Sequence, residues 1–213
     1  MLVIKIRNNQ LIKVFMENVI KLRKGLDINL KGTACKGTIS TLKSGEYALV
    51  PESFCGVIPK VVVHEGDKVK AGEALFVSKK YPEVKFASPV SGTVETILRG
   101  ERRKILYVKV KADEQQQFLD FGSKDVNSLD SEAVKNALLD AGIFGYIKQL
   151  PYAVSTTPDT DPKAIFISAF RDMPLASDFE VELEGNEKDF QTGLNALSKI
   201  QKTYLGISSN QTA

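Results

Sequence analysis

Tryptophan is absent from this 213-residue sequence, and histidine occurs once, at His64. Cysteine occurs only at Cys35 and Cys55, and one histidine without nearby cysteines or paired carboxylates argues against a metal site. No apolar run approaches the roughly 18 residues that span a bilayer. Charges interrupt the first 24 residues, unlike a signal peptide. The sequence therefore predicts two free thiols in a reducing compartment rather than a disulfide-stabilised secreted domain.

The composition, 43% hydrophobic and 26% charged, is that of a folded chain with one large or two ordinary domains. Residues 1–112 contain 21 Lys and Arg against 10 Asp and Glu, whereas residues 113–213 contain 8 against 16. This division indicates that the first half faces an anionic partner, or that the halves attract each other; an ordinary solvated surface is the alternative. Nucleic acid is not expected, because the aromatic residues near the positive charges occupy strand-like positions.

The central stretch, residues 64–94, alternates turn signals with short apolar runs. Gly66-Asp67 and Gly72-Glu73 predict turns, because glycine adopts positive φ without a Cβ clash. Strands are expected around residues 61–63, 75–77, 84–86 and 93–97, which fits a small β-sandwich or barrel. The order Gly-Asp-x-Val-x-x-Gly-x-x-Leu, then Ser-Pro-Val-Ser-Gly-Thr-Val, resembles the lipoyl and biotinyl carrier domains. That resemblance implies a flattened barrel, the barrel-sandwich hybrid.

In carrier domains of this type, a modified lysine stands at the tip of a hairpin. Here the tip falls near Lys80-Tyr81-Pro82-Glu83, and the usual sequence around a modified lysine is missing. We therefore expect that the fold is kept and the cofactor lost. A carrier domain modified on Lys79 or Lys80 is the alternative.

A strongly basic turn follows the central stretch and precedes a strand expected at residues 105–110. It could hold an anionic partner, a lipid headgroup or a nucleotide phosphate, or simply keep a hairpin tip soluble. With the tip lysines, it supplies the residues predicted to face a partner or an anion: Arg99, Arg102, Arg103, Lys104, Lys79 and Lys80.

The second half changes to a helical period. Val134, Leu138 and Ala141 predict a helix, with Asp130 or Ser131 as its N-cap and Gly142 at its end. Residues 112–128 are expected to form a polar connector. A buried parallel strand at 164–169, a helix at 189–199 and a strand from Thr203 suggest the start of a Rossmann-like α/β domain.

The predicted fold class of the whole chain is thus mixed α/β. Its domains are an N-terminal extension (1–18, with Met16 as an alternative start), a barrel-sandwich hybrid (19–112) and a partial α/β domain (113–213).

Four segments together resemble one family more specifically. They are IKLRKGLDINLKG at 20–32, the barrel stretch through FASPVSGTVETILRGERRKILYVKV, LLDAGIFGYIKQLPY at 138–152, and AIFISAFRDMPLASD at 164–178. This pattern is similar to the A subunit of the sodium-translocating NADH:quinone oxidoreductases, from about Val19 to the end of the chain. That family continues well beyond these residues, so we expect this sequence to be a fragment.

The resemblance implies a peripheral subunit on the cytoplasmic face of a bacterial inner membrane, with membrane-embedded and flavin-bearing subunits as partners. NADH, flavins and quinone are then cofactors or substrates of the whole complex, and none is expected in this chain. No Gly-x-Gly-x-x-Gly follows the Ile165 strand, where Phe170-Arg171-Asp172-Met173-Pro174 stands instead. We therefore expect a scaffold or docking subunit that is not catalytic alone.

The site of any quinone contact stays open from the sequence. Quinone contact is associated with the family, but no residue here identifies a quinone pocket. A free-standing flavin- or nucleotide-binding protein is a further alternative. The group Asp172, Pro174, Leu175 and Ala176 is interpreted as a turn after the strand.

Overall fold

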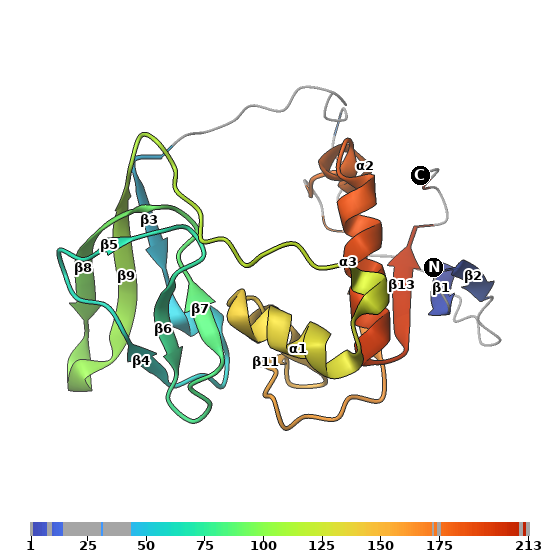
Figure 1. Cartoon of the computed structure of the whole chain (residues 1–213), viewed down its shortest axis with the longest axis horizontal. Coiled ribbons are helices and arrows are strands. Elements are labelled where there is room, and N and C mark those ends of the chain that lie inside the picture. Colours follow the sequence, from blue (N-terminus) through green and yellow to red (C-terminus); the bar gives the residue numbers. More distant parts are fainter. Residues whose placement is uncertain are drawn as a thin grey trace. The chain divides into compact units, whose positions relative to one another are not determined.

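The structure is a computed structural model that describes residues 2–7, 10–14, 31, 44–171, 173, 176–208 and 211. It contains two compact units, each made of more than one chain segment (Figure 1). The barrel unit comprises residues 42–124 and 135–161, and the α/β unit comprises residues 1–41, 125–134 and 162–213. Cys35 and residues 20–28 lie outside the described residues.

The barrel unit contains two antiparallel sheets, ordered β3-β9-β8-β5 and β4-β6-β7. Their strands are β3 (Glu46–Leu49), β4 (Pro59–Val61), β5 (Lys68–Val69), β6 (Ala74–Ser78), β7 (Lys85–Ala87), β8 (Gly92–Arg99) and β9 (Ile105–Ala112). The strands expected near residues 75–77, 84–86, 93–97 and 105–110 are confirmed. Shorter elements complete the unit: η1 (Pro51–Ser53), η2 (Glu101–Arg103), η4 (Phe144–Tyr146), β10 (Lys148–Gln149) and β11 (Val154–Ser155).

An aromatic cluster occupies the centre of the barrel core. The Phe76 and Phe86 rings stack with centroids 4.9 Å apart, and Phe54 lies 4.3 Å from Phe86. Phe76 and Phe86 are fully buried. Such rings bury about 150–250 Å² each and contribute most of the hydrophobic stabilisation of a small core. The β-branched residues at alternate strand positions close the core around them: Val94, Val108 and Val110.

Two glycines are required by close packing of this unit. A Cβ built on Gly92, in β8, would lie 1.9 Å from the Lys111 carbonyl oxygen of β9. A Cβ on Gly145 would lie 2.6 Å from the Phe86 ring. The segment after residue 135 thus packs against the aromatic cluster, with Leu139 and Phe144 in the same core. The barrel unit therefore extends beyond residue 112 and takes in residues 135–161.

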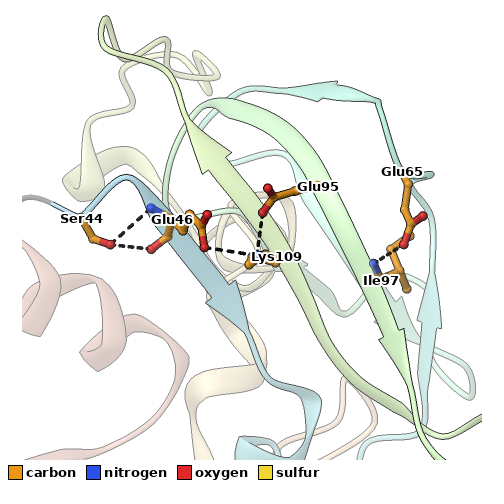
Figure 2. Close-up of polar contacts among 6 residues, drawn as sticks. All are labelled: Ser44, Glu46, Glu65, Glu95, Ile97 and Lys109. Carbon is orange, nitrogen blue, oxygen red and sulfur yellow. Dashed lines mark hydrogen bonds and ion pairs between the residues drawn. The ribbon is translucent and has the colours of Figure 1, made fainter.

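Charged side chains line part of the four-stranded sheet, where Lys109 of β9 lies between two carboxylates (Figure 2). Its Nζ is 2.7 Å from Glu95 on β8 and 3.2 Å from Glu46 on β3. Hydrogen bonds first to Glu95 and then to Glu46 raise the pKa of Lys109 above its ordinary value. Nearby, the Ile97 N–H donates to a Glu65 carboxylate oxygen at 2.7 Å. The two ion pairs of Lys109 thus link β9 to its neighbours β3 and β8.

The polar connector after β9 is hydrogen-bonded to the barrel along its first residues. The buried Ser91 accepts from the Gln117 N–H at 2.9 Å, and its own N–H donates to the Gln116 amide oxygen at 2.8 Å. Ala71 accepts from the Leu119 N–H and donates to the Gln117 carbonyl, each at 2.9 Å. The glutamine run is therefore hydrogen-bonded to the barrel, although its residues are exposed.

Helix α1 (Ser131–Asp140) begins and ends as predicted. The Ala133 N–H donates to the Asp130 carboxylate at 2.8 Å, which caps the first turn. Gly142 follows the helix with φ +70°, a left-handed conformation that glycine adopts at low cost. The division between the two units falls within this helix, after Val134.

The α/β unit contains a sheet ordered β12-β13-β1-β2. Figure 1 labels three of its strands, β13, β1 and β2, together with helices α2 and α3. The four strands are β1 (Leu2–Arg7), β2 (Gln10–Val14), β12 (Ile165–Ser168) and β13 (Thr203–Ile207). The helical elements of this unit are α2 (Phe179–Leu183), α3 (Glu187–Ile200) and η3 (Val126–Ser128). Strands β12 and β13 are parallel and connected through α3, as the sequence predicts. Leu194 of α3 packs with Ala169 and Leu205 to form the core.

One expectation about this sheet is wrong. The apolar run at 164–169 predicts a strand buried on both faces, yet Phe166 is 68% exposed and stacks on Tyr204 with ring centroids 5.3 Å apart. Ile167 faces the α3 side, where it packs on the small core. Ile165 and Ile167 on one face of the strand are half-buried, whereas Phe166 and Ser168 on the other face are exposed.

The first residues of the chain form a hairpin that extends this sheet. Strand β1 pairs antiparallel with β13, from Leu2 opposite Ile207 to Ile6 opposite Thr203, and β2 pairs with β1. Strand β13 therefore has a neighbour on both edges. That residues 1–18 are an N-terminal extension stays a prediction.

Candidate functional site

The most concentrated charge in the barrel unit lies at the turn between β8 and β9. The Lys104 N–H donates to the Glu101 carbonyl at 3.1 Å, and both intervening residues have positive φ: +53° at Arg102 and +61° at Arg103. This backbone corresponds to a type I′ turn, which favours Asn-Gly because side chains with a Cβ are strained in the left-handed region. Two arginines therefore occupy positions that disfavour them.

The turn forms one edge of a pocket of about 760 Å³ in the barrel unit. The pocket is lined by six basic residues: Lys60, Lys79, Arg99, Arg102, Arg103 and Lys104. Apolar residues line the rest of it, among them Pro51, Phe54, Val57, Ile58, Val61 and Ile105. Five of the six residues predicted to face a partner or an anion are thus brought together.

Strand pairing explains how distant residues reach one pocket. Strand β4 pairs with β6, so that Pro59 lies opposite Ser78, and the Lys79 N–H donates to the Ile58 carbonyl at 2.8 Å. Lys104 reaches Glu52 of η1 at 3.2 Å. Lys60 has no counterpart among the predicted residues. The signal that could have identified Lys60 is its position in a short strand, β4, because β4 pairs with β6 and β6 ends just before Lys79.

Lys80, the sixth predicted residue, does not line this pocket. Its Nζ lies 4.8 Å from the centroid of the Tyr81 ring, a cation–π contact. Interaction with Tyr81 raises the pKa of Lys80. The Tyr81 hydroxyl in turn donates to Asp159 at 2.7 Å. Lys80 thus belongs to the turn between β6 and β7 and its contact with the loop around Asp159.

Asp159 gives this contact a pH dependence. Hydrogen bonds from the Thr157 hydroxyl and then the Tyr81 hydroxyl lower the pKa of Asp159 below its ordinary value of 3.8. A carboxylate with a lowered pKa in the folded state stabilises that state above its unfolded pKa, and this stabilisation is lost as the pH falls through the folded pKa. Asp159→Asn is expected to reduce the loss of stability as the pH falls below the ordinary carboxyl pKa of 3.8, measured by urea unfolding.

The matched control is Asp161→Asn, an exposed carboxylate two residues away with no hydrogen bond or ion pair among the described residues. It is expected to keep the acid dependence of the unsubstituted chain. If both variants change the pH profile equally, the Tyr81–Asp159 contact is not its source.

The strained turn leads to a second prediction. Arg102→Asn with Arg103→Gly places the preferred residues of a type I′ turn in the observed backbone. The double variant is expected to be more stable by about 1 kcal/mol, because a left-handed strain is removed from each position. Thermal and urea unfolding measure this. The control is Lys111→Gly, in the extended backbone of β9, which should lower stability. If the double variant is destabilised as much as this control, the two arginines are not strained in the turn.

The remaining candidate residues take no part in a cluster. The His64 side chain is 89% exposed, and its Nδ1 lies 3.5 Å from Asp67. Cys55 is exposed at the pocket wall and has no disulfide. No group of three or more His, Cys, Asp or Glu that could hold a metal ion occurs in the described part of the chain.

The loop after β12 is closed by side-chain contacts. The Arg171 guanidinium binds Glu182 of α2 at 2.8 Å and also the Ser177 hydroxyl. The Ser168 hydroxyl donates to the Phe170 carbonyl at 2.9 Å. Asp172, Pro174 and Leu175, interpreted from sequence as a turn, lie outside the described residues. Among the helices that the structure describes, none is long and apolar enough to cross a membrane.

Comparison with known proteins covers both units. Residues 20–113 match the family of the NqrA N-terminal barrel-sandwich hybrid domain, and residues 129–213 match the NqrA second alpha/beta domain. Curated relatives of this chain carry the name of the A subunit of Na(+)-translocating NADH-quinone reductase. The one from Actinobacillus pleuropneumoniae serotype 5b (strain L20) is 38% identical over 184 residues. Those from Yersinia pestis bv. Antiqua (strain Angola) and Haemophilus influenzae (strain PittGG) are 36% identical over 188 residues and 34% identical over 184 residues.

In each case the match covers 85% of this chain and 41% of the relative, so the chain spans about two-fifths of the length of these proteins. The two matched domains follow each other in the order of the two predicted folds, and together they include the four segments on which the resemblance rests. The chain therefore belongs to the family of the A subunits of the Na+-translocating NADH-quinone reductases.

Proposed function

We propose that this chain is part of a peripheral subunit that docks onto the other subunits of a sodium-translocating NADH-quinone reductase. The observation that carries this proposal is the match of both of its domains to the A subunits of these enzymes, at 34–38% identity. A protein named as one subunit of an enzyme works together with the others. We place it on the cytoplasmic face of a bacterial inner membrane, against membrane-embedded and flavin-bearing partners.

In this proposal the redox chemistry belongs to the partners. A dinucleotide site after β12 would need glycines that let the pyrophosphate approach backbone N–H groups. Phe170 and Arg171 stand there, and Arg171 is held by Glu182 and Ser177. NADH oxidation, flavin electron transfer and sodium movement are therefore assigned to other subunits, and quinone to the complex as a whole.

The charge of the barrel unit supports docking. The six basic residues of its pocket face a single carboxylate among the lining residues, Glu52, which is paired with Lys104. Complementary charge accelerates the encounter with a partner and fixes its orientation. Lys79 and the four basic residues from Arg99 to Lys104 would contribute to this surface.

The experiment is purification of the tagged protein from its native membranes under mild detergent, at low and moderate salt. Flavin-bearing membrane polypeptides should co-purify, with NADH:quinone activity stimulated by sodium. Recovery of a lone soluble protein at both salt concentrations would contradict the proposal. The mass of the tryptic peptides that contain Lys79 and Lys80 tests the carrier-domain alternative, because a covalent cofactor would increase it.

A further inference from the structure

The barrel pocket has an excess of positive charge that the described residues do not neutralise. Lys104 pairs with Glu52, but no carboxylate in the described part of the chain lies within ion-pair distance of the other five basic residues around the pocket. Like charges gathered at one site repel one another and attract an anion.

The backbone adds an independent indication. Arg102 and Arg103 are held in left-handed conformations at the pocket edge, although Asn-Gly would relieve the strain. Strained residues of this kind gather at ligand sites, where the surrounding structure holds them in place. Two guanidinium groups are therefore presented at the pocket at a cost in stability.

The pocket is far larger than a free anion needs. Its volume of about 760 Å³ lies within the usual range of small-molecule sites, about 300–1,000 Å³. Its lining includes the buried side chains of Phe54 and Ile105, the half-buried Val57 and Val61, and Ile58, which is 65% exposed. An inorganic anion alone would leave this apolar wall in contact with water.

Together these features define the ligand by chemistry. Guanidinium groups bind phosphate oxygens through paired hydrogen bonds, and several cations suit a group with up to about two negative charges better than they suit one carboxylate. We infer that the barrel pocket is a binding site for a phosphate group carried on an uncharged, apolar body. The phosphate lies against Arg102 and Arg103, and the apolar body covers the exposed Ile58 and the half-buried Val57. The site shares its basic residues with the proposed docking surface, but binding of a small phosphate needs no partner subunit.

Calorimetric titration of the full chain with hexyl phosphate and with inorganic phosphate tests the inference. Hexyl phosphate is expected to bind at least about tenfold more tightly than inorganic phosphate, because its methylene groups are transferred from water into the apolar part of the pocket. Arg102→Asn with Arg103→Gly should weaken hexyl phosphate binding about tenfold. This variant is expected to be more stable than the unsubstituted chain, so the loss cannot come from unfolding. Ile58→Ser should reduce the preference for hexyl phosphate over inorganic phosphate.

The matched control is Lys68→Gln with Lys70→Gln, which removes two exposed positive charges from the barrel unit outside the pocket. It should bind hexyl phosphate as the unsubstituted chain does at about 150 mM salt, where distant surface charges are screened. Equal affinity for the two phosphates, no binding of either, or equal weakening by both double variants would overturn the inference.

Vesicles distinguish the two sources of such a ligand. If the phosphate is a lipid headgroup, the chain will sediment with phosphatidylglycerol vesicles but not with phosphatidylcholine vesicles, and hexyl phosphate will release it. If it belongs to a soluble metabolite, hexyl phosphate will bind while neither vesicle does. Both outcomes support the site and differ only in where its phosphate comes from.

Discussion

Replacing Gly92 by alanine is expected to lower the free energy of unfolding by about 3 kcal/mol or more, because it overpacks a sheet that cannot yield. The added Cβ would lie 1.9 Å from the Lys111 carbonyl oxygen and 2.8 Å from its carbon. Both atoms belong to the backbone of β9, which is paired with β3 and β8 on its two sides. Relief therefore requires separating strands. Urea unfolding followed by circular dichroism measures the change.

Gly45→Ala is the matched control for this substitution. Gly45 lies just before β3, where an added Cβ would meet no atom within 4 Å, and its carbonyl accepts from the Ala112 N–H in the same sheet. The same chemical change there should alter stability by less than about 0.5 kcal/mol. If the Gly92 and Gly45 variants unfold at the same urea concentration, close approach of β8 and β9 is not what Gly92 provides.

Removing the Phe86 ring is expected to lower the free energy of unfolding by about 3–5 kcal/mol, the usual cost of replacing a buried phenylalanine by alanine. Phe86 is fully buried, stacks on Phe76 and contacts Phe54. It also lies against Gly145, so its loss leaves a cavity between β7 and the segment after α1. Thermal and urea unfolding of Phe86→Ala measure the effect.

Phe118→Ala provides the comparison, since the Phe118 side chain is 73% exposed. The same atoms are removed from a residue that is already in contact with water, so the change should be below about 1 kcal/mol. A similar loss in both variants would mean that the aromatic cluster is not the centre of the barrel core.

Local pattern sufficed for much of the fold. Alternation and turn glycines located β6 to β9, since neighbouring strands joined by short turns pair with each other. The cap at Asp130 and the glycine at 142 located α1, because both act within one helical turn. Strand, helix and strand at the end of the chain predicted a parallel pair, as right-handed crossovers do.

Contacts between distant segments escaped prediction for a physical reason. Gln116 and Gln117 look like ordinary solvent-facing residues in the sequence, yet they are hydrogen-bonded to Ser91, about 25 residues earlier, and Gln117 also to Ala71. The β1–β2 hairpin likewise depends on an edge of β13 at the other end of the sequence. Polar side chains and strand edges carry no local sign of the partner that satisfies them.

The residues of the candidate site also fall into those that were predicted from sequence and those that were not. Charge density identified Arg99 to Lys104, which are neighbours in the chain. Lys60 was missed, because its place in the pocket comes from the pairing of β4 with β6. Lys80 was grouped with Lys79 by sequence, but successive side chains diverge, and Lys80 lies over Tyr81 instead. Proximity in sequence is a weak guide to which of two adjacent cations faces a pocket.

The division of the barrel unit into two chain segments affects how a nascent chain would fold. Leu139 and Phe144 belong to the same core as Phe54, which is far earlier in the sequence. A ribosome that has released residues 42–124 has therefore exposed an aromatic cluster that still lacks part of its cover, while residues 125–134 belong to the other unit. Chains fold as their units emerge, so completion of the barrel waits for residues 135–161 to leave the exit tunnel. Until then, part of the aromatic cluster stays uncovered, and transiently exposed apolar surface of this kind is prone to aggregate.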